Sequence, residues 1–479
     1  MNSSVVKSFM RLARLLALLL FVSVACAQQV QFPDTPAARQ CAAWLKLFNG
    51  TDREAYGAYL EKNIPSRAGN LDREWDFRQR TGGFDLRKIE ESTPATLVVL
   101  LKERGSDQFA RLTLQVNAAE PHVIIRFEIR AIPTPDDFSQ PHLSESELIS
   151  ALRKKLEQDS ANGRFAGAAL LAKDGKPVFA EAYGLADREQ KLPNTLHTRF
   201  RIGSMNKMFT AVAILQLVQA GKLGLNDPLG KYLTDYPNKD VASQVTIHHL
   251  LTHTGGTGDI FGPEFDAHRL ELRTLQDYVK LYGNRGLAFS PGSGRWEYSN
   301  YGFILLGVVI EKVSGESYYD YVREHIYKPA GMTSTGSEPE NQPVADRSIG
   351  YTSMGSGSPH PNTDTLPWRG TSAGGGYSTV GDLLSFANAL QQNKLLNAKY
   401  TELLTTGKVP GPIGSYAYGF EDRTINGTRC FGHGGGAPGM NGDLKICPGP
   451  GYIIAVLSNM DPPAASRISD FIASRLPGR

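Results

Sequence analysis

The sequence has little cysteine, no large excess of charge of one sign, and no early apolar run long enough for a membrane helix. Four cysteines in 479 residues allow at most two disulfides. The 51 basic and 48 acidic side chains nearly cancel, so no basic surface for nucleic acid is implied. The N-terminal apolar run, residues 15–24, is too short to span a bilayer. With 41% hydrophobic residues, the chain can instead form at least two domains and is not wholly disordered.

Residues 1–27 are typical of a secretory signal. An apolar run follows a basic start, and the small residues Ala25, Cys26 and Ala27 form a cleavage site. Removal of the three basic residues in this segment brings the formal net charge from +3 to zero. We therefore expect an exported protein, periplasmic or secreted, with no membrane span after cleavage. Acylation of Cys26 is a minor alternative, because Ser23 occupies a position that is usually aliphatic in lipoprotein signals.

Three cysteines remain after cleavage, and their odd number leaves at least one without an intramolecular partner. Cys41 falls on the apolar face of an expected helix and is predicted to be a buried thiol. Cys430 and Cys447 flank a glycine-rich reversal near Gly439, so the two strands leaving it would bring them face to face. An exported protein enters an oxidising compartment, where disulfides can persist, and we predict one between these two residues.

The first folded part is predicted to be a small α+β module over residues 33–132. Two amphipathic helices, 36–49 and 53–63, precede strand-like segments separated by turn-forming residues, at 83–89, 95–103, 108–116 and 122–131. This element order resembles the cystatin-like, nuclear-transport-factor-like fold. The module contains no cluster of acids, bases or metal ligands, which favours a packing or recognition role.

A proline-containing acidic linker is expected over residues 133–143, and a second domain over 144–479. A new amphipathic helix begins near Ser144, and the segments 165–173 and 177–183 form a hairpin around Asp174 and Gly175.

The sharpest chemical pattern in the second domain is Ser204-Met205-Asn206-Lys207. The segment follows a short strand-like stretch and opens an apolar helix, so its spacing places Ser204 and Lys207 one turn apart on one face. A serine hydroxyl needs a proton acceptor before it becomes a nucleophile, and a desolvated lysine can be that acceptor. The same residues could otherwise be a helix-capping serine and a surface lysine.

Two downstream motifs add side chains that a serine nucleophile would need. Tyr298-Ser299-Asn300 lies between a glycine-rich turn and an apolar helix, which could aim a phenol and an amide into a cleft. His433-Gly434-Gly435-Gly436 follows a strand, and its glycines let a substrate approach the backbone closely.

In this order, the three motifs resemble those of the serine β-lactamase and penicillin-binding-protein superfamily. The resemblance is greatest to its class C branch, with the related esterases and D-amino-acid peptidases. It covers roughly residue 144 to the C-terminus and includes TIHHLLTHTGG at 246–256 and AGGGYSTVGDLLSFA at 373–387. It implies a catalytic domain in which an antiparallel sheet is flanked by helices, beside a helical region.

The resemblance also implies a role for each motif residue. Ser204 would be the acylated nucleophile, Lys207 its proton acceptor, and Tyr298 the proton relay and later the activator of water. Asn300 would hold the acyl side of the substrate, and the backbone N–H groups of Ser204 and Gly436 would form the oxyanion hole.

The third motif departs from the family's pattern. His433, Gly434 and Gly435 stand where the family usually has lysine, threonine and glycine. His433 is expected to be only partly charged at neutral pH, and Gly434 has no side chain. Binding of the carboxylate that β-lactams carry should therefore be weak.

Two other catalytic arrangements are less consistent with the sequence. Gly370-Thr371-Ser372-Ala373-Gly374 matches a nucleophile elbow, but its glycine-rich oxyanion segment would have to precede it, and no separate histidine follows. His248, His249 and His253 could suggest zinc, and His249 and His253 would share a helical face. No further ligand is evident, so we interpret them as structural.

The sequence thus predicts an exported two-domain serine hydrolase that needs no metal or organic cofactor. Its expected substrates are small esters, amides or peptides containing D-amino acids, with weak β-lactamase activity at most. Two alternatives remain: a penicillin- or peptidoglycan-binding protein that is acylated without turnover, and a purely structural role if the motifs do not converge.

Overall fold

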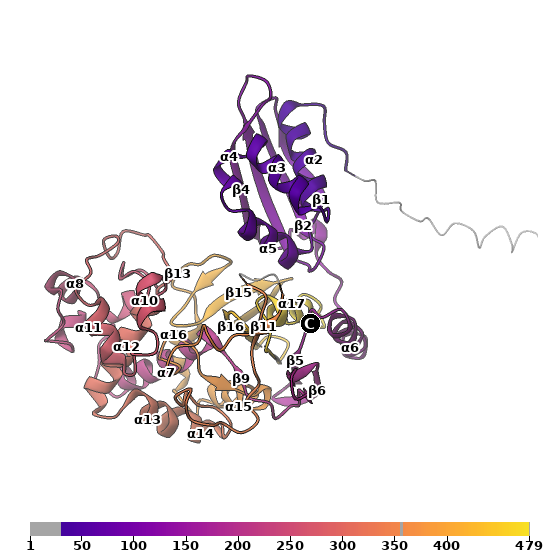
Figure 1. Cartoon of the computed structure of the whole chain (residues 1–479). Helices are drawn as coiled ribbons and strands as arrows, with labels where there is room; N and C mark the ends of the chain where they lie inside the picture. Colours follow the sequence, from indigo (N-terminus) through magenta and orange to yellow (C-terminus); the bar gives the residue numbers. More distant parts are fainter. Residues whose placement is uncertain (1–29, 355–357, 479) are drawn as a thin grey trace, which may run out of the picture.

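The computed structural model describes residues 30–354 and 358–478. The predicted signal sequence, with Cys26, lies outside these residues. Figure 1 shows a small N-terminal module beside a larger second domain. Across the part of the chain that the structure describes, we find no helix with the length and apolar character that a membrane span requires.

The N-terminal module is a four-stranded antiparallel meander in the order β1-β2-β3-β4, with helix α2 packed across it. The helices are α2 (Pro36–Phe48), α3 (Arg53–Asn63), α4 (Pro65–Ala68) and α5 (Leu71–Thr81). The strands are β1 (Phe84–Ser92), β2 (Thr96–Glu103), β3 (Phe109–Val116) and β4 (Ile124–Ile132). The sequence predicts the first two helices and all four strands, whereas α4 and α5 are found only in the structure.

Local signals explain the helices of the module. The Thr35 side chain caps α2 by accepting from the Ala38 backbone N–H, and the apolar face of α2 carries Trp44 and Phe48 into the core. Cys41 lies on the same face as a fully buried free thiol, and burial raises its pKa to about 12. Helix α5 has no clean apolar stripe, because seven of its eleven residues are charged or amide side chains. Leu71, Trp75 and Phe77 pack against the core of the module, although no apolar periodicity marks this helix in the sequence.

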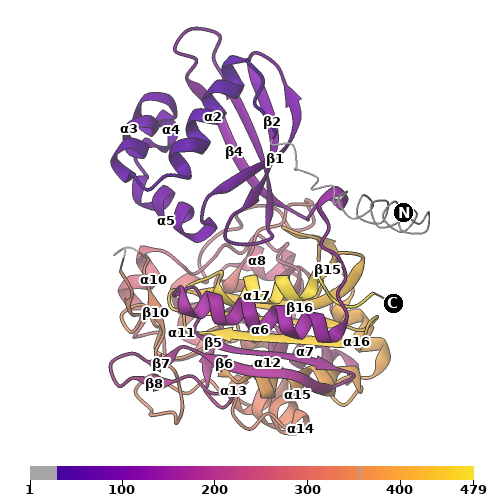
Figure 2. The same ribbon diagram turned by 90° about the vertical axis from the view of Figure 1, so that its right-hand side faces the viewer.

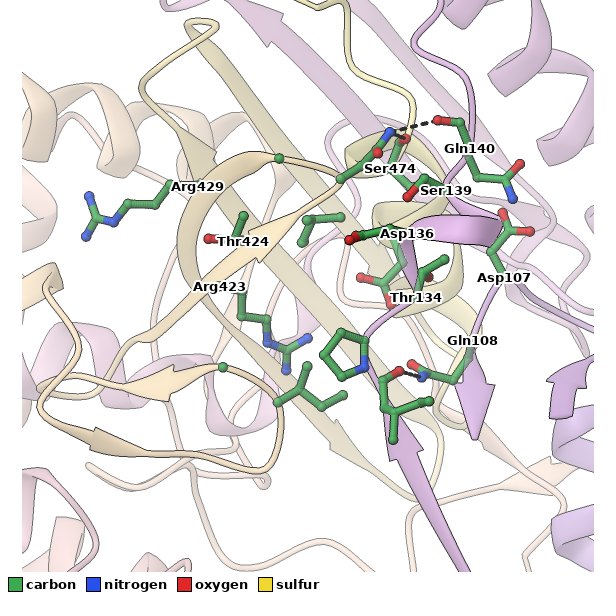
Figure 3. A pocket seen from close by; sticks show the side chains of 18 of the residues that line it. Asp107, Gln108, Thr134, Asp136, Ser139, Gln140, Arg423, Thr424, Arg429 and Ser474 are labelled. Carbon is green, nitrogen blue, oxygen red and sulfur yellow. Dashed lines mark hydrogen bonds between the residues drawn. The ribbon is translucent and has the colours of Figure 1, made fainter. Parts of the chain in front are cut away.

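Polar contacts join the module and linker to the second domain. The Arg475 guanidinium pairs with Asp107 at 2.8 Å and also donates to the side-chain oxygen of Gln140 at 2.8 Å. In the linker, the only regular element is the short 3₁₀ helix η1 (Asp136–Phe138), among the residues that the structure describes. Beside these contacts lies a cavity of about 570 Å³, lined by module and linker on one side and by strands of the second domain on the other (Figure 3).

The second domain is built on an eight-stranded antiparallel sheet in the order β13-β14-β15-β16-β17-β18-β5-β6. Its strands are β5 (Gly167–Lys173), β6 (Lys176–Tyr183), β13 (Val409–Pro410), β14 (Ser415–Tyr416), β15 (Glu421–Ile425), β16 (Thr428–Ala437), β17 (Met440–Cys447) and β18 (Tyr452–Ser458). The β5–β6 turn has positive φ at Asp174 and Gly175, as a tight two-residue hairpin requires.

Helices cover both faces of this sheet (Figures 1 and 2). Helices α6 (Glu145–Ala161) and α17 (Ala464–Ala473) pack on one face. The other face and the adjoining helical region contain η2 (Gly203–Met205), α7 (Asn206–Gln219), η3 (Leu229–Lys231), α8 (Lys239–Gln244), α9 (Ile247–Leu251), α10 (Pro263–His268), α11 (Leu275–Tyr282), α12 (Asn300–Ser314), α13 (Tyr318–Val322), η4 (Arg323–Tyr327), α14 (Lys328–Ala330), α15 (Val380–Gln391) and α16 (Ala398–Thr405). Short strand pairs lie outside the main sheet: β7 (Leu185–Asp187) with β8 (Leu192–Pro193), β9 (Phe200–Arg201) with β12 (Tyr377–Ser378), and β10 (Tyr351–Thr352) with β11 (His360–Pro361).

Strand β18 is apolar from Ile453 to Leu457 because both of its faces are covered. Ile454 and Val456 pack with α6 and α17, whereas Ile453, Ala455 and Leu457 join the larger core on the opposite face. Successive side chains of a strand point to opposite faces, so a strand covered on both sides is apolar at successive positions. Strand β17 lies between β18 and β16, the strand that borders the candidate site.

Strands β16 and β17 are covalently joined. Cys430 and Cys447 form a disulfide across the pair, next to the register partners Phe431 and Ile446. Cys430 lies three residues before His433, and the disulfide is on the sheet face that packs against α6 and α17.

Candidate active site

Ser204 lies in the 3₁₀ turn η2, immediately before α7, and not within the helix itself. Strand β16 approaches this turn so closely that glycine is required on both sides. A Cβ atom on Gly435 would lie 1.9 Å from the Ile202 carbonyl oxygen, and one on Gly203 would lie 2.8 Å from the Gly436 nitrogen. This close approach brings the backbones of Ser204 and Gly436 near each other. Their N–H groups are the two expected to form an oxyanion hole.

Lys207 is fully buried, and its amine contacts Ser204 directly. Its Nζ donates to Ser204 Oγ at 3.3 Å, to Asn300 Oδ1 at 2.7 Å and to the Ala373 carbonyl oxygen at 2.6 Å. Burial lowers the pKa of Lys207 from 10.5 to about 7, and the negative charge of Asp259 limits the shift. A substantial share of the amine is therefore neutral at physiological pH and can accept the serine proton.

Tyr298 lies on the other side of the reacting hydroxyl. Its ring centroid is 4.7 Å from Lys207 Nζ. Burial raises the pKa of Tyr298 well above its usual value, and interaction with the Ser204 side chain only partly offsets this. The side chain is a phenol at neutral pH, so it can donate a proton to a leaving group.

Asn300 is the first residue of α12, and Ser299 caps this helix by accepting from the Gly302 backbone N–H. Its side-chain oxygen accepts from Lys207, and its amide nitrogen donates to Asp259 Oδ2 at 3.2 Å. The Asn300 backbone N–H donates to the other carboxylate oxygen of Asp259, at 2.9 Å. One amide hydrogen of Asn300 remains for a substrate oxygen.

His433 lies in β16 at the edge of the same cluster and is buried. Its Nε2 lies 3.0 Å from the Tyr416 hydroxyl, and its Nδ1 lies 2.5 Å from the Gly434 carbonyl oxygen. Burial lowers the pKa of His433 from 6.5 to about 4, and the nearby Lys207 adds to this effect. The expectation of a partly charged histidine is corrected: buried beside a cationic amine, the ring is neutral at pH 7.

The two glycines that follow His433 differ in their steric demands. A side chain on Gly435 would collide with Ile202, whereas a Cβ on Gly434 would meet only the Gly442 carbonyl oxygen, at an ordinary 3.6 Å. The missing side chain at Gly434 is therefore not imposed by packing. It is an open position in the third motif.

The competing serine is in the wrong environment for catalysis. Ser372 is fully buried against Gly307 of α12, and its hydroxyl has no hydrogen-bond partner. The carbonyl of Ser372 accepts from Thr210, and the next carbonyl, that of Ala373, accepts from Lys207. This segment supports the Ser204 site instead of forming a second one.

The histidines of the TIHHLLTHTGG segment do not share one face. Helix α9 ends at Leu251, and His253 lies beyond it with a left-handed φ of 60°, so the expectation that His249 and His253 align is wrong. His249 accepts from the Thr246 backbone N–H, and His248 contacts the Tyr418 hydroxyl. Among residues 30–354 and 358–478, no group of three or more histidine, cysteine or acidic side chains is arranged to hold a metal ion.

Three residues near the site were not identified from the sequence. Asp259 contacts Asn300, Tyr416 contacts His433, and the His253 ring contacts the Tyr298 ring in a tilted arrangement with centroids 4.3 Å apart. Asp259 and Tyr416 belong to no motif that marks a catalytic role. The sequence indicates His253 only as one of three nearby histidines, because nothing in the sequence places it beside Tyr298.

The chain matches the family model described as Beta-lactamase over residues 152–478. Two curated relatives are the putative penicillin-binding protein PbpX of Bacillus subtilis, 34% identical over 53% of this chain and 62% of PbpX, and the esterase EstB of Burkholderia gladioli, 34% identical over 41% of this chain and 54% of EstB. The chain thus spans less than two thirds of either protein. A solved D-stereospecific amidohydrolase from Streptomyces is 28% identical, with a TM-score of 0.58 over 68% of this chain and 98% of that one.

The family match begins in α6 and leaves the N-terminal module outside, so the cystatin-like interpretation of the module remains a prediction. The match spans more than half of the chain and contains all three motifs, with the geometry around Ser204 described above. The chain therefore belongs to the beta-lactamase family.

Proposed function

We propose that the protein hydrolyses small, uncharged esters or amides through an acyl-enzyme on Ser204. Membership of the family makes it a hydrolase, and the proposal concerns its substrate and its residues. The observation that carries it is the buried Lys207 amine, 3.3 Å from Ser204 Oγ and with a pKa of about 7. That arrangement generates a serine nucleophile at neutral pH.

In this mechanism, Ser204 Oγ attacks the substrate carbonyl while its proton passes to Lys207. The oxyanion that forms lies between the backbone N–H groups of Ser204 and Gly436. The proton then passes through Tyr298 to the leaving alcohol or amine as the scissile bond breaks. Water next attacks the acyl-enzyme, gives its proton to Tyr298, and the proton returns to Ser204 as the acid is released.

The third motif supports an uncharged substrate. The neutral His433 offers no fixed positive charge to a carboxylate, and Gly434 offers no hydroxyl. The names of the relatives EstB and the D-stereospecific amidohydrolase support the two bond types, ester and amide. Peptides containing D-amino acids fall within the same proposal.

A second candidate is a penicillin- or peptidoglycan-binding protein that is acylated without turnover. The similarity to the putative penicillin-binding protein PbpX favours it. In either case we propose an exported protein, periplasmic or secreted, whose N-terminal module serves packing or recognition. Anchoring through an acylated Cys26 is the minor variant.

The test is a panel of p-nitrophenyl esters, D-alanyl peptides and a chromogenic cephalosporin, assayed with the native protein and with Ser204→Ala. Steady turnover of esters or amides that disappears in Ser204→Ala supports the proposed function. A single burst of product without turnover identifies the second candidate. Ester hydrolysis that persists in Ser204→Ala contradicts both.

A further inference from the structure

A line of buried side chains runs from α12 to the third motif. The Ser299 backbone N–H donates to His253 Nδ1 at 3.1 Å, and His253 Nε2 lies 3.0 Å from the Tyr416 hydroxyl. The same hydroxyl lies 3.0 Å from His433 Nε2, and His433 Nδ1 lies 2.5 Å from the Gly434 carbonyl oxygen. The three side chains are at most 4% exposed.

The two ends of this line fix the direction of every hydrogen bond. A backbone N–H can only donate, so His253 Nδ1 carries no hydrogen, and the single hydrogen of the neutral ring is on Nε2. That N–H donates to Tyr416, whose own hydrogen must then go to His433 Nε2. The remaining hydrogen of His433 is on Nδ1, where the Gly434 carbonyl accepts it.

These hydrogen bonds are incompatible with an additional proton on His433. If His433 were protonated, both of its nitrogens would be donors, and the buried Tyr416 hydroxyl would receive two N–H groups and lose the acceptor for its own hydrogen. The charged and titratable groups around the line are Lys207, Tyr298, Glu421, Arg423 and Asp443. Burial and Lys207 lower the pKa of both histidines, and at His433 the hydrogen bond to the Gly434 carbonyl and the charge of Asp443 act in the opposite direction without cancelling them.

We propose that His253 and Tyr416 are positioning residues that hold His433 as its neutral Nδ1–H tautomer, and that the His433 ring thereby fixes the glycine strand 434–436 beside Ser204. Glycines 434, 435 and 436 have no side chains of their own to restrain this strand. Pairing with β17 and a hydrogen bond from the Asn441 side chain to the Gly435 carbonyl hold the segment in the sheet. The His433 Nδ1–H bond to the Gly434 carbonyl adds a restraint from a side chain, two residues before the Gly436 N–H. Neither ring nitrogen of His433 is then free for substrate, so His433 acts through the backbone.

This inference rests on the proposed function only for its kinetic test. Tyr416→Phe keeps the buried ring and removes the hydroxyl that links the two histidines. Because the variant breaks both hydrogen bonds of the Tyr416 hydroxyl and leaves the His433 ring unrestrained, we expect kcat for the best ester of the panel to fall about tenfold or more, with KM changed less than twofold. A loss confined to KM, or native kinetics, would overturn the proposal.

A matched control is present nearby. The Tyr418 hydroxyl bonds to His248 Nδ1 at 2.8 Å, so Tyr418→Phe also breaks a tyrosine–histidine hydrogen bond of a buried tyrosine, but this bond involves neither His253 nor His433. This variant should retain the native kcat. An equal loss of kcat in both variants would mean that Tyr416 acts only through general packing, and would overturn the positioning role.

The tautomers can be measured without any substrate. Histidine ¹⁵N spectra of the full-length protein, assigned with His253→Gln and His433→Gln variants, should show His433 as the Nδ1–H and His253 as the Nε2–H tautomer from pH 6 to 8. In Tyr416→Phe both signals should shift, and in Tyr418→Phe neither should. An Nε2–H or a protonated His433 at pH 6 would overturn the inference, even if the protein proves to be an esterase. The predicted tautomers in a protein that cleaves no ester or amide would instead contradict the proposed function alone.

Discussion

Lys207 and Asn300, 93 positions apart in the chain, are joined by a 2.7 Å hydrogen bond from the lysine amine to the asparagine side-chain oxygen. The bond connects the helix that follows Ser204 with the helix that follows Tyr298. It therefore holds the Lys207 amine and the Asn300 side-chain amide in one geometry. Asn300 also hydrogen-bonds to Asp259, and the negative charge of that carboxylate raises the pKa of the buried Lys207 amine.

Replacement of the nucleophile should remove activity and leave the fold intact. We expect Ser204→Ala to lower kcat by about 10⁴-fold or more, because no acyl-enzyme can form, while the melting temperature stays near native. Ser372→Ala is the matched control, since that hydroxyl is buried and has no partner. Loss of activity in Ser372→Ala together with an active Ser204→Ala would contradict the assignment.

The two proton carriers should affect turnover more than binding. Lys207→Ala and Tyr298→Phe should each lower kcat by about 10²-fold or more, because each removes a group that moves the reacting proton. Steady-state kinetics on the preferred ester separates kcat from KM. A rise in KM with native kcat would show that these side chains bind substrate and do not carry its protons.

The pH dependence should follow the Lys207 amine, which must be neutral to accept the serine proton. Since its pKa is lowered to about 7, kcat/KM should rise as the pH increases through that value. Asp259 raises the pKa of Lys207, so Asp259→Asn should move this acid limb to lower pH. A limb that stays in place or moves upward in Asp259→Asn would contradict this electrostatic coupling.

The Cys430–Cys447 disulfide should stabilise the segment that carries His433. It closes a loop with a sequence separation of 17, and a loop of that size is worth about 3 kcal/mol through the unfolded state. Cys430→Ala with Cys447→Ala should therefore lower the melting temperature, as measured by calorimetry. Mass spectrometry after alkylation of unfolded protein should find only Cys41 labelled once the signal is removed, and labelling of all three cysteines would refute the bridge.

Restoring a hydroxyl at the third motif should change substrate preference. A side chain fits at Gly434, so we expect Gly434→Thr to raise the ratio of cephalosporin to ester efficiency by about tenfold, the effect of one added hydrogen bond to the carboxylate. Gly435→Thr is the control, since it collides with Ile202 and should lose both activities. A native protein that already prefers the cephalosporin would overturn this interpretation of the motif.

Much of the fold could be predicted from local signals. The Thr35 cap, the apolar face around Trp44 and the Asp174-Gly175 turn each predict one element, because caps, periodicity and turn residues act within a few positions. Helix α5 could not be predicted from periodicity, since its charged sequence has no clear apolar face, although Gly82 caps its C-terminus and Leu71, Trp75 and Phe77 pack on the module's core.

The candidate site, like the fold, was predicted in part from local sequence and was otherwise decided by the tertiary structure. The spacing of Ser204 and Lys207 by itself predicts that both lie on one face, because residues three positions apart are about one turn apart in an α-helix or a 3₁₀ helix. The neutral state of His433 and the contacts of Asp259, His253 and Tyr416 were decided only by the tertiary structure. A pKa depends on burial and on charges brought from other elements, and a hydrogen bond between residues 163 or 41 positions apart exists only once the chain has folded.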